Sequence, residues 1–189
     1  MSKVNFGKDQ WDMSKFRYVY SPRFTPIPRI KQESDCIVNG TDPVTGEFDY
    51  VSMLTEKEYT TGVTVETTCS FEAYGAPLIV FSDDLRKKEN GEWYYGVHYE
   101  VVLWEEGINV WRLDLNDDAM YWDKVLGVQF PVSVKEPHPL KVKLQEKGID
   151  IETEGRKMYV KIEDMPSKMR VGITACEGIN RFYSLEITE

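Results

Sequence analysis

Short runs of alternating apolar and polar residues recur along this 189-residue chain from about residue 29 onward. Such alternation places successive side chains on opposite faces of an extended strand and is typical of half-buried β-strands. Turn residues separate the runs, as at Asn90-Gly91, Lys147-Gly148 and Glu154-Gly155. Strands are expected over 29–38, 47–55, 62–72, 76–82, 94–104, 108–115, 127–133, 139–145, 148–153, 157–162, 169–176 and 180–187. So many antiparallel strands predict an all-β domain of two stacked sheets.

Helix is expected only as a turn near 83–89 or 116–123, because no segment sustains a 3.6-residue apolar period. Residues 1–24 carry several aromatic side chains among charges but show no clear period. The following Thr25-Pro26-Ile27-Pro28 is too proline-rich for a central strand. We therefore expect residues 1–28 to form an N-terminal arm packed on the sandwich, and residues 29–189 to form the β-sandwich domain.

The charge and cysteine content restrict the partners and the compartment. A formal net charge of -9 disfavours nucleic acid and anionic membranes, which are bound mainly through Lys and Arg. No stretch approaches the roughly 20 apolar residues of a membrane span, and the first residues contain no apolar leader segment. Cys36, Cys69 and Cys176 are odd in number and far apart, which favours a reducing compartment. We expect a cytoplasmic protein.

Several motifs of known chemistry are missing from the sequence. It has no GxSxG, GxxxxGK[ST], GxGxxG or HExxH motif and no paired CxxC. His98 and His138 do not lie near any cysteine in the sequence, and the cysteine spacings do not fit zinc. Phosphoryl transfer, nicotinamide chemistry and zinc hydrolysis therefore have no support, and we expect neither a cofactor nor a metal.

The best-defined hairpin runs from Tyr95 to Trp104, turns at 105–107, and returns from Ile108 to Leu113. A two-residue loop at either possible position leaves the parity of the two strands unchanged. One predicted face is apolar and suits a core: Tyr95, Val97, Tyr99, Val101, Leu103, Ile108, Val110 and Arg112. The other face mixes indoles with polar groups: His98, Glu100, Val102, Trp104, Asn109, Trp111 and Leu113.

The mixed face has the groups that a sugar site uses. Trp104 and Trp111 can stack on the apolar C–H face of a pyranose, while Glu100, His98 and Asn109 can bind its hydroxyls. These five residues are the predicted ligand-binding set, and the expected partner is a carbohydrate or glycoside. In the alternative, the two indoles pack under a loop or a neighbouring strand, and Glu100 pairs with Arg112 or another cation.

Glu100 and His98 are also the candidate catalytic residues. A glycoside hydrolase needs two carboxyl groups, separated by about 5–5.5 Å for retention or about 6.5–9.5 Å for inversion of configuration. Glu100 could supply one of them, with His98 orienting it or acting as a base. The sequence does not choose its partner among five acids: Glu105, Glu106, Asp114, Asp117 and Glu177.

A four-residue sequence occurs twice, as Glu106-Gly107-Ile108-Asn109 and as Glu177-Gly178-Ile179-Asn180. Each copy lies between a β-rich run and an aromatic strand. Two hairpins with the same turn chemistry explain the repeat, since glycine can adopt the positive φ that such turns need. A duplicated half-domain is the alternative.

The runs Gly75–Phe81, Tyr99–Trp104 and Arg181–Ile187 resemble the strands of the concanavalin A-like lectin and glucanase superfamily. The resemblance spans about residues 30–187 and rests on the rhythm of the strands. It implies a jelly-roll sandwich, as in legume lectins, galectins, laminin G-like modules and laminarinase-like hydrolases, with carbohydrate on a concave sheet. Function follows from fold only by association.

The chain departs from two patterns of that superfamily. Laminarinase-like enzymes carry ExDxxE on one strand, whereas the matching segment Tyr99–Glu105 lacks the central acid. The histidine, asparagine and arginine set of galectins has no residue-by-residue match. Three hypotheses follow: a lectin-like module or accessory protein of bacterial sugar metabolism, a cytoplasmic glycoside hydrolase, and an interaction module whose aromatic face is covered by a partner or a second copy.

Overall fold

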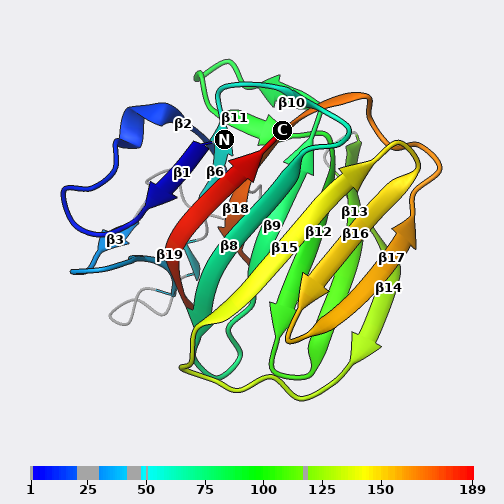
Figure 1. Ribbon diagram of the computed structural model, residues 1–189. Helices are drawn as coiled ribbons and strands as arrows, with labels where there is room; N and C mark the ends of the chain where they lie inside the picture. The colour runs from blue at the N-terminus through cyan, green and yellow to red at the C-terminus, as the bar shows by residue number, and fades with distance from the viewer. Residues whose placement is uncertain (1, 21–29, 42–47, 50, 117–118) are drawn as a thin grey trace.

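The computed structural model describes residues 2–20, 30–41, 48–49, 51–116 and 119–189 and consists of strands in two curved sheets (Figure 1). The predicted all-β, two-sheet jelly-roll sandwich is confirmed. One 3-10 turn, η1 (Met13–Lys15), is the helical element of these ranges. The expected helical turns are wrong, because 85–87 form a strand and the described residues of 116–123 belong to two paired strands.

The nine-stranded sheet lies in front in Figure 1 and has the order β17-β16-β15-β8-β19-β4-β3, with β1 added to β19 and β5 to β4. Its pairings are antiparallel. The strands are β1 (Ser2–Asn5), β3 (Lys31–Gln32), β4 (Ile37–Thr41), β5 (Phe48–Asp49), β8 (Thr64–Phe71), β15 (His138–Gln145), β16 (Gly148–Thr153), β17 (Arg156–Lys161) and β19 (Ile179–Thr188).

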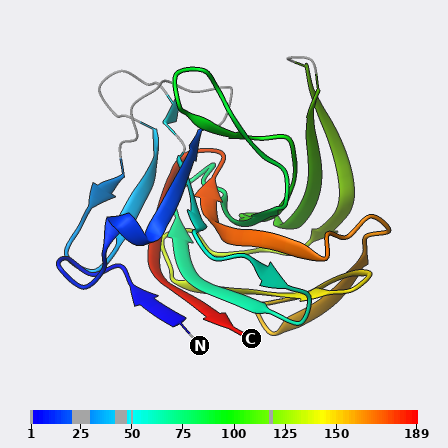
Figure 2. The same cartoon turned by 90° about the horizontal axis from the view of Figure 1, so that it is seen from above.

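The ten-stranded sheet lies behind it, with the order β10-β11-β2-β6-β18-β9-β12-β13-β14 and β7 added to β18. Its strands are β2 (Phe16–Tyr20), β6 (Val51–Thr55), β7 (Tyr59–Thr60), β9 (Pro77–Ser82), β10 (Leu85–Lys87), β11 (Trp93–Tyr95), β12 (Val97–Trp104), β13 (Gly107–Asn116), β14 (Ala119–Gln129) and β18 (Lys168–Ala175). Figure 2 shows this sheet curved, so that the β10–β11 margin and the β13–β14 margin rise on the same side.

The segment expected as an N-terminal arm contributes strands to both sheets. β1 pairs with β19 in the nine-stranded sheet, and β2 pairs with β6 in the ten-stranded sheet. Phe6 and Phe16 from this segment are buried in the core between the sheets. Residues 21–28, the end of the expected arm, lie outside the described residues.

Strand β9 is buried on both faces, which explains its unbroken apolar sequence. Ile79 and Phe81 belong to the core between the sheets, whereas Leu78 and Val80 belong to a second apolar cluster on the other face of the ten-stranded sheet. A strand covered on both sides has no solvent face, so its sequence does not alternate. The second cluster forms the floor on which the candidate site is built.

The edge strand β14 is where the sequence prediction was least accurate. The expected strand at 127–133 is instead a strand from Ala119 to Gln129, and residues 130–133 are not in a strand. Most of its side chains are exposed or half-buried, so its sequence carries little apolar alternation. Its identity as a strand follows from pairing with β13, which the sequence of β14 alone does not encode.

The described segments contain no helix long and apolar enough to cross a membrane. All three cysteines are free thiols. Burial raises the pKa of both the Cys36 and the Cys69 thiol to about 12, so both stay protonated at neutral pH.

Candidate functional site

The register of β12 and β13 determines which of their side chains lie on the face of the ten-stranded sheet that carries the second apolar cluster. Trp104 pairs with Gly107, so the hairpin loop is Glu105-Glu106. Glu100 lies opposite Trp111, and Val102 lies opposite Asn109. Opposed residues of an antiparallel pair share a face, so the predicted parity of these two strands is confirmed.

Tyr95 is an exception, and its predicted place on the core face is wrong. It is 4 % exposed in the second apolar cluster, on the same side as Leu78 and Val102, and its ring stacks on His98 at 4.3 Å. The cause is a break at Gly96, which separates β11 from β12 and shifts the alternation.

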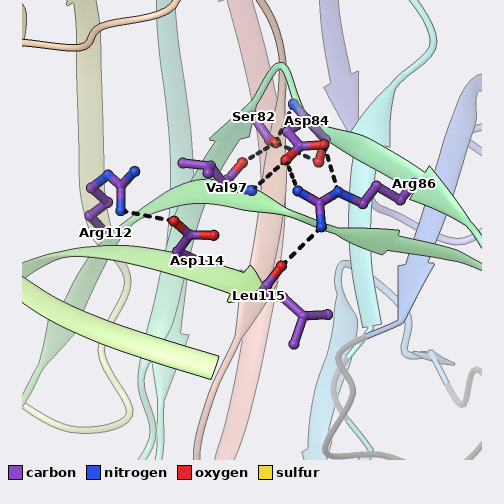
Figure 3. Close-up of polar contacts among 7 residues, drawn as sticks. All are labelled: Ser82, Asp84, Arg86, Val97, Arg112, Asp114 and Leu115. Carbon is purple, nitrogen blue, oxygen red and sulfur yellow. Dashed lines mark hydrogen bonds and ion pairs between the residues drawn. The ribbon is translucent and has the colours of Figure 1, made fainter. Parts of the chain in front are cut away.

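A network around Asp84 fixes that break (Figure 3). Both oxygens of Asp84 accept hydrogen bonds from Arg86, at 3.0 and 2.7 Å, and Oδ2 also accepts one from the Val97 N–H at 3.0 Å. Arg86 Nη1 donates to the carbonyl of Leu115 on β13 at 3.0 Å. A Cβ at position 96 would overlap the Asp84 carboxylate, so glycine is needed there. The network ties the β9–β10 turn to β12 and β13.

A pocket of about 250 Å³ opens at the other end of the β12–β13 hairpin. Trp104 ends β12, and Asn109 and Trp111 lie on β13, so three of the five predicted ligand-binding residues line one cavity. Segments distant in the sequence complete it: the 74–76 turn before β9 and the 176–177 turn after β18. The described residues of the lining are Tyr74, Gly75, Ala76, Val102, Trp104, Glu105, Asn109, Trp111, Cys176 and Glu177.

The pocket combines an apolar floor with free polar groups. Ala76 and Val102 belong to the second apolar cluster, and Trp104 and Trp111 pack against it while remaining half-buried. The side chains of Glu105, Asn109 and Glu177 make no hydrogen bond or ion pair with any residue that the structure describes. Two stacking surfaces beside a carboxamide and two carboxylates make a site for a ligand with one apolar face and several hydroxyls.

Two neighbours on β14 hold the Trp111 indole in place. The Nζ atom of Lys124 lies 4.7 Å from the centroid of its ring, within cation–π range. Trp122 packs edge-on at 6.1 Å between ring centroids. Neither residue lines the pocket, so Trp111 is supported from outside it.

The turn after β18 is anchored by a buried amide. Asn180 is fully buried, and its Nδ2 donates to the carbonyls of Glu177 at 2.7 Å and Asn39 at 3.1 Å. The N–H of Ala76 donates to the same Glu177 carbonyl at 3.3 Å. Gly178 has φ +57, and a Cβ there would lie 2.7 Å from the backbone nitrogen of Gly75. The Glu177 and 74–76 turns are therefore held against each other.

Tyr74 stands out in the pocket lining. It has φ 65, which is costly for a bulky residue, and its side chain is 76 % exposed. The turn that imposes this conformation is closed by a 2.7 Å hydrogen bond from the Gly75 N–H to the Glu72 carbonyl. Local strain of this kind clusters at functional sites.

His98 and Glu100 do not line this pocket. His98 is 4 % exposed, the Glu100 side chain is 12 % exposed, and His98 Nε2 lies 3.5 Å from Glu100 Oε1. Glu100 therefore takes His98 as its partner rather than Arg112, which pairs with Asp114 and Asp164. The predicted set is divided into an open part, Trp104, Asn109 and Trp111, and this covered pair.

No second carboxylate flanks Glu100 among its neighbours on the adjacent strands. Directly opposite are Val80 and Trp111, and the diagonal positions on the same face are Leu78, Ser82, Asn109 and Leu113. Of the candidate partners, Glu105 and Glu106 lie beyond the end of β12, roughly 16 Å along the strand. Asp114 lies on the opposite face, Glu177 lines the pocket, and Asp117 lies outside the described residues. The described residues also contain no group of three or more acidic, His or Cys side chains that could hold a metal.

Comparisons with known proteins bear on the architecture. No family model matches the sequence, and no curated protein matches it. Among solved structures, one reported with endo-acting O-glycanases that human gut microbiota express to initiate mucin breakdown superposes with a TM-score of 0.69 at 9% identity, covering 100% of this chain and 98% of the other.

Two further solved structures also superpose on this chain. A glycoside hydrolase family 16 endo-glucanase from Bacteroides ovatus gives a TM-score of 0.68 at 10% identity, over 99% of each chain. The carbohydrate-binding module CBM66 from Bacillus subtilis gives 0.54 at 15% identity, over 80% of this chain and 92% of the other. This chain has the concanavalin A-like lectin and glucanase fold. The resemblance predicted from the runs Gly75–Phe81, Tyr99–Trp104 and Arg181–Ile187 is thereby confirmed at the level of fold.

Within the concanavalin A-like fold, the sequence prediction missed the part of the pocket that comes from distant segments. Tyr74 and Cys176 were not predicted, and Glu177 was named only as a possible second acid for Glu100; all three are about 30 residues or more from Trp104 in the sequence. The repeated Glu-Gly-Ile-Asn sequence is the signal that could have located them, because both copies lie beside the pocket. In the first copy Asn109 opens into the pocket, whereas in the second Asn180 anchors the turn that carries Glu177.

Proposed function

We propose that this protein binds carbohydrate in the pocket between the β12–β13 hairpin and the 74–76 and 176–177 turns. Trp104 and Trp111 provide the surfaces on which a sugar ring stacks. Asn109, Glu105 and Glu177 hydrogen-bond its hydroxyls. The observation that carries the proposal is the convergence of two half-buried indoles and three polar side chains, none of the three bonded to a described residue, on one cavity of about 250 Å³.

The architecture supports the same conclusion by analogy. The endo-glucanase and the CBM66 module are carbohydrate-active proteins by their own descriptions, and they share this fold. Binding is favoured over hydrolysis by Glu100, because Glu100 has no carboxylate among its cross-strand neighbours and its side chain is 12 % exposed. The two carboxylates of the pocket, Glu105 and Glu177, are assigned here to the binding of hydroxyls. A hydrolase would need a second acid within about 10 Å of the first.

The proposal is tested by titrating the protein with neutral oligosaccharides of glucose, galactose and N-acetylglucosamine while tryptophan fluorescence is recorded. Trp104→Ala and Trp111→Ala should each weaken binding about tenfold or more, since a stacked aromatic contributes more than 1 kcal/mol. Trp111→Phe should retain part of the affinity.

Tyr159→Ala is the matched control, because Tyr159 is 55 % exposed on β17, in the other sheet. Its removal should leave the affinity unchanged. Thermal unfolding of each variant separates a lost contact from a lost fold. Failure of every oligosaccharide to bind the folded wild-type protein would contradict the proposal.

A further inference from the structure

Two acidic turns converge on the proposed sugar pocket. Glu105 is in the loop between β12 and β13, and Glu177 is in the turn between β18 and β19. They are more than 70 residues apart in the sequence, yet both line the same cavity. Neither carboxylate has a cationic partner in the part of the chain that the structure describes.

Two basic side chains on the adjoining strands make contacts of their own. Lys124 Nζ lies 4.7 Å from the centroid of the Trp111 ring and is not among the residues that line the pocket. Arg112 is on the opposite face of β13, where it pairs with Asp114 at 3.5 Å and Asp164 at 3.3 Å. Among the residues that the structure describes, the pocket lining therefore contains two carboxylates and no cation, in a chain whose net charge is -9.

We infer that the pocket selects uncharged sugar units and rejects glycans that carry sulfate or carboxylate groups. The inference rests on the proposed function and names its ligand class. A carboxylate can only accept hydrogen bonds, and a neutral sugar offers hydroxyl donors that match Glu105 and Glu177. A sulfate or uronate group is also only an acceptor. Placed here, it would face two like charges, and the side-chain donors of the described lining are uncharged.

The size of the discrimination follows from Coulomb repulsion near a protein surface. Like charges a few ångströms apart cost on the order of 1 kcal/mol or more at the dielectric of a partly exposed site. Each 1.4 kcal/mol changes affinity tenfold. Dissolved salt screens the repulsion between such half-exposed groups, so the discrimination should shrink as ionic strength rises. Specificity of this kind arises from an unfavourable contact with the wrong ligand.

The test uses matched tetrasaccharides of β-linked glucose, galactose and N-acetylglucosamine, each as the neutral compound and as its 6-O-sulfate. Calorimetric titration at pH 7 and low salt should give affinities about tenfold or more weaker for the sulfated member of any pair that binds. In the Glu105→Gln/Glu177→Gln double variant, this gap should fall to within about threefold. Glu105 is half-buried and Glu177 is exposed, and neither side chain bonds to a described residue, so the stability of the fold should be unaffected.

The outcomes separate the two proposals. Equal or tighter binding of the sulfated compounds would overturn this inference and leave the pocket standing as a sugar site. A gap that persists unchanged in the double variant would overturn the assignment of the two glutamates. Binding of neither member of any pair would overturn the proposed function together with this inference.

Discussion

Glu100 and Trp111 lie directly opposite each other on β12 and β13, yet only Trp111 lines the pocket. The Glu100 side chain turns to His98, 3.5 Å away, and is 12 % exposed. His98 is covered in turn by the ring of Tyr95. Two neighbouring residues on one face therefore have different roles: Glu100 pairs with the buried His98, and Trp111 belongs to the proposed site.

Glu100→Gln should lower stability without weakening glycan binding. The amide keeps the shape of the side chain but removes the charge that faces His98, so we expect a loss of about 1 kcal/mol in the free energy of unfolding. Affinity should stay within about twofold. Urea unfolding and fluorescence titration measure the two effects, with Glu106→Gln, an exposed acid outside the pocket, as the control. A large loss of affinity or of glycan cleavage in a variant that stays folded would show that Glu100 belongs to the functional site.

Asn109 and Asn180 occupy equivalent positions of the repeated sequence and should respond oppositely to alanine substitution. Asn109→Ala removes a side chain with no described protein partner, so stability should change by less than about 0.5 kcal/mol while affinity falls about fivefold. Asn180→Ala removes a fully buried amide that donates to the carbonyls of Glu177 and Asn39 and should cost about 2 kcal/mol of stability. Identical stability losses in the two variants would refute the difference in role.

Tyr74 should reveal its backbone strain through a comparison of two small replacements. Tyr74→Ala and Tyr74→Gly both remove the ring from the pocket and should weaken glycan binding equally. At ordinary positions alanine is the more stable of the two. With φ 65 the order should reverse, and the glycine variant should be more stable by about 1 kcal/mol. Thermal denaturation of the two variants measures this order. If the alanine variant were the more stable, the turn would have changed its backbone conformation to relieve the strain.

The Asp84 network predicts a specific acid sensitivity. Hydrogen bonds from Arg86, and then from the Val97 N–H, lower the pKa of Asp84 from its ordinary value of 3.8. A group whose pKa is lower in the folded state stabilises the fold above the unfolded value, and that contribution is lost as pH falls through the folded value. The free energy of unfolding should thus decline below about pH 4, and the decline should be shallower in Asp84→Asn. Parallel declines in urea titrations at pH 7, 4 and 3 would argue against this contribution.

The sequence was sufficient for the strands whose two faces have different environments. In β12 and β13 the alternation of apolar and mixed residues predicted both the pairing parity and the grouping of Trp104, Asn109 and Trp111. It failed at Tyr95, because the alternation resets at Gly96, where the Asp84 carboxylate occupies the space of a Cβ. That constraint comes from a residue on another strand and leaves no local pattern.

The sequence did not predict the bounds of the exposed strand β14 or the place of Tyr74 and Glu177 in the pocket. These two failures have the same kind of cause as the failure at Tyr95. β14 is a strand because β13 pairs with it, and its own exposed residues carry little periodicity. Tyr74 and Glu177 reach the pocket because β18 and β9 are neighbours in the ten-stranded sheet, although they are far apart in the chain. Non-local pairing of this kind is set by the packing of the whole sandwich.

The central claim is that sugar contacts Trp104 and Trp111, and the five tryptophans of the chain allow a direct measurement. In a ¹H–¹⁵N correlation spectrum each indole N–H gives one signal, assigned by single Trp→Phe variants. Titration with the tightest neutral tetrasaccharide should shift the signals of Trp104 and Trp111, while those of Trp11 and Trp93, which lie outside the pocket lining, stay in place. Saturable shifts confined to Trp11 or Trp93, with Trp104 and Trp111 unmoved, would contradict the account.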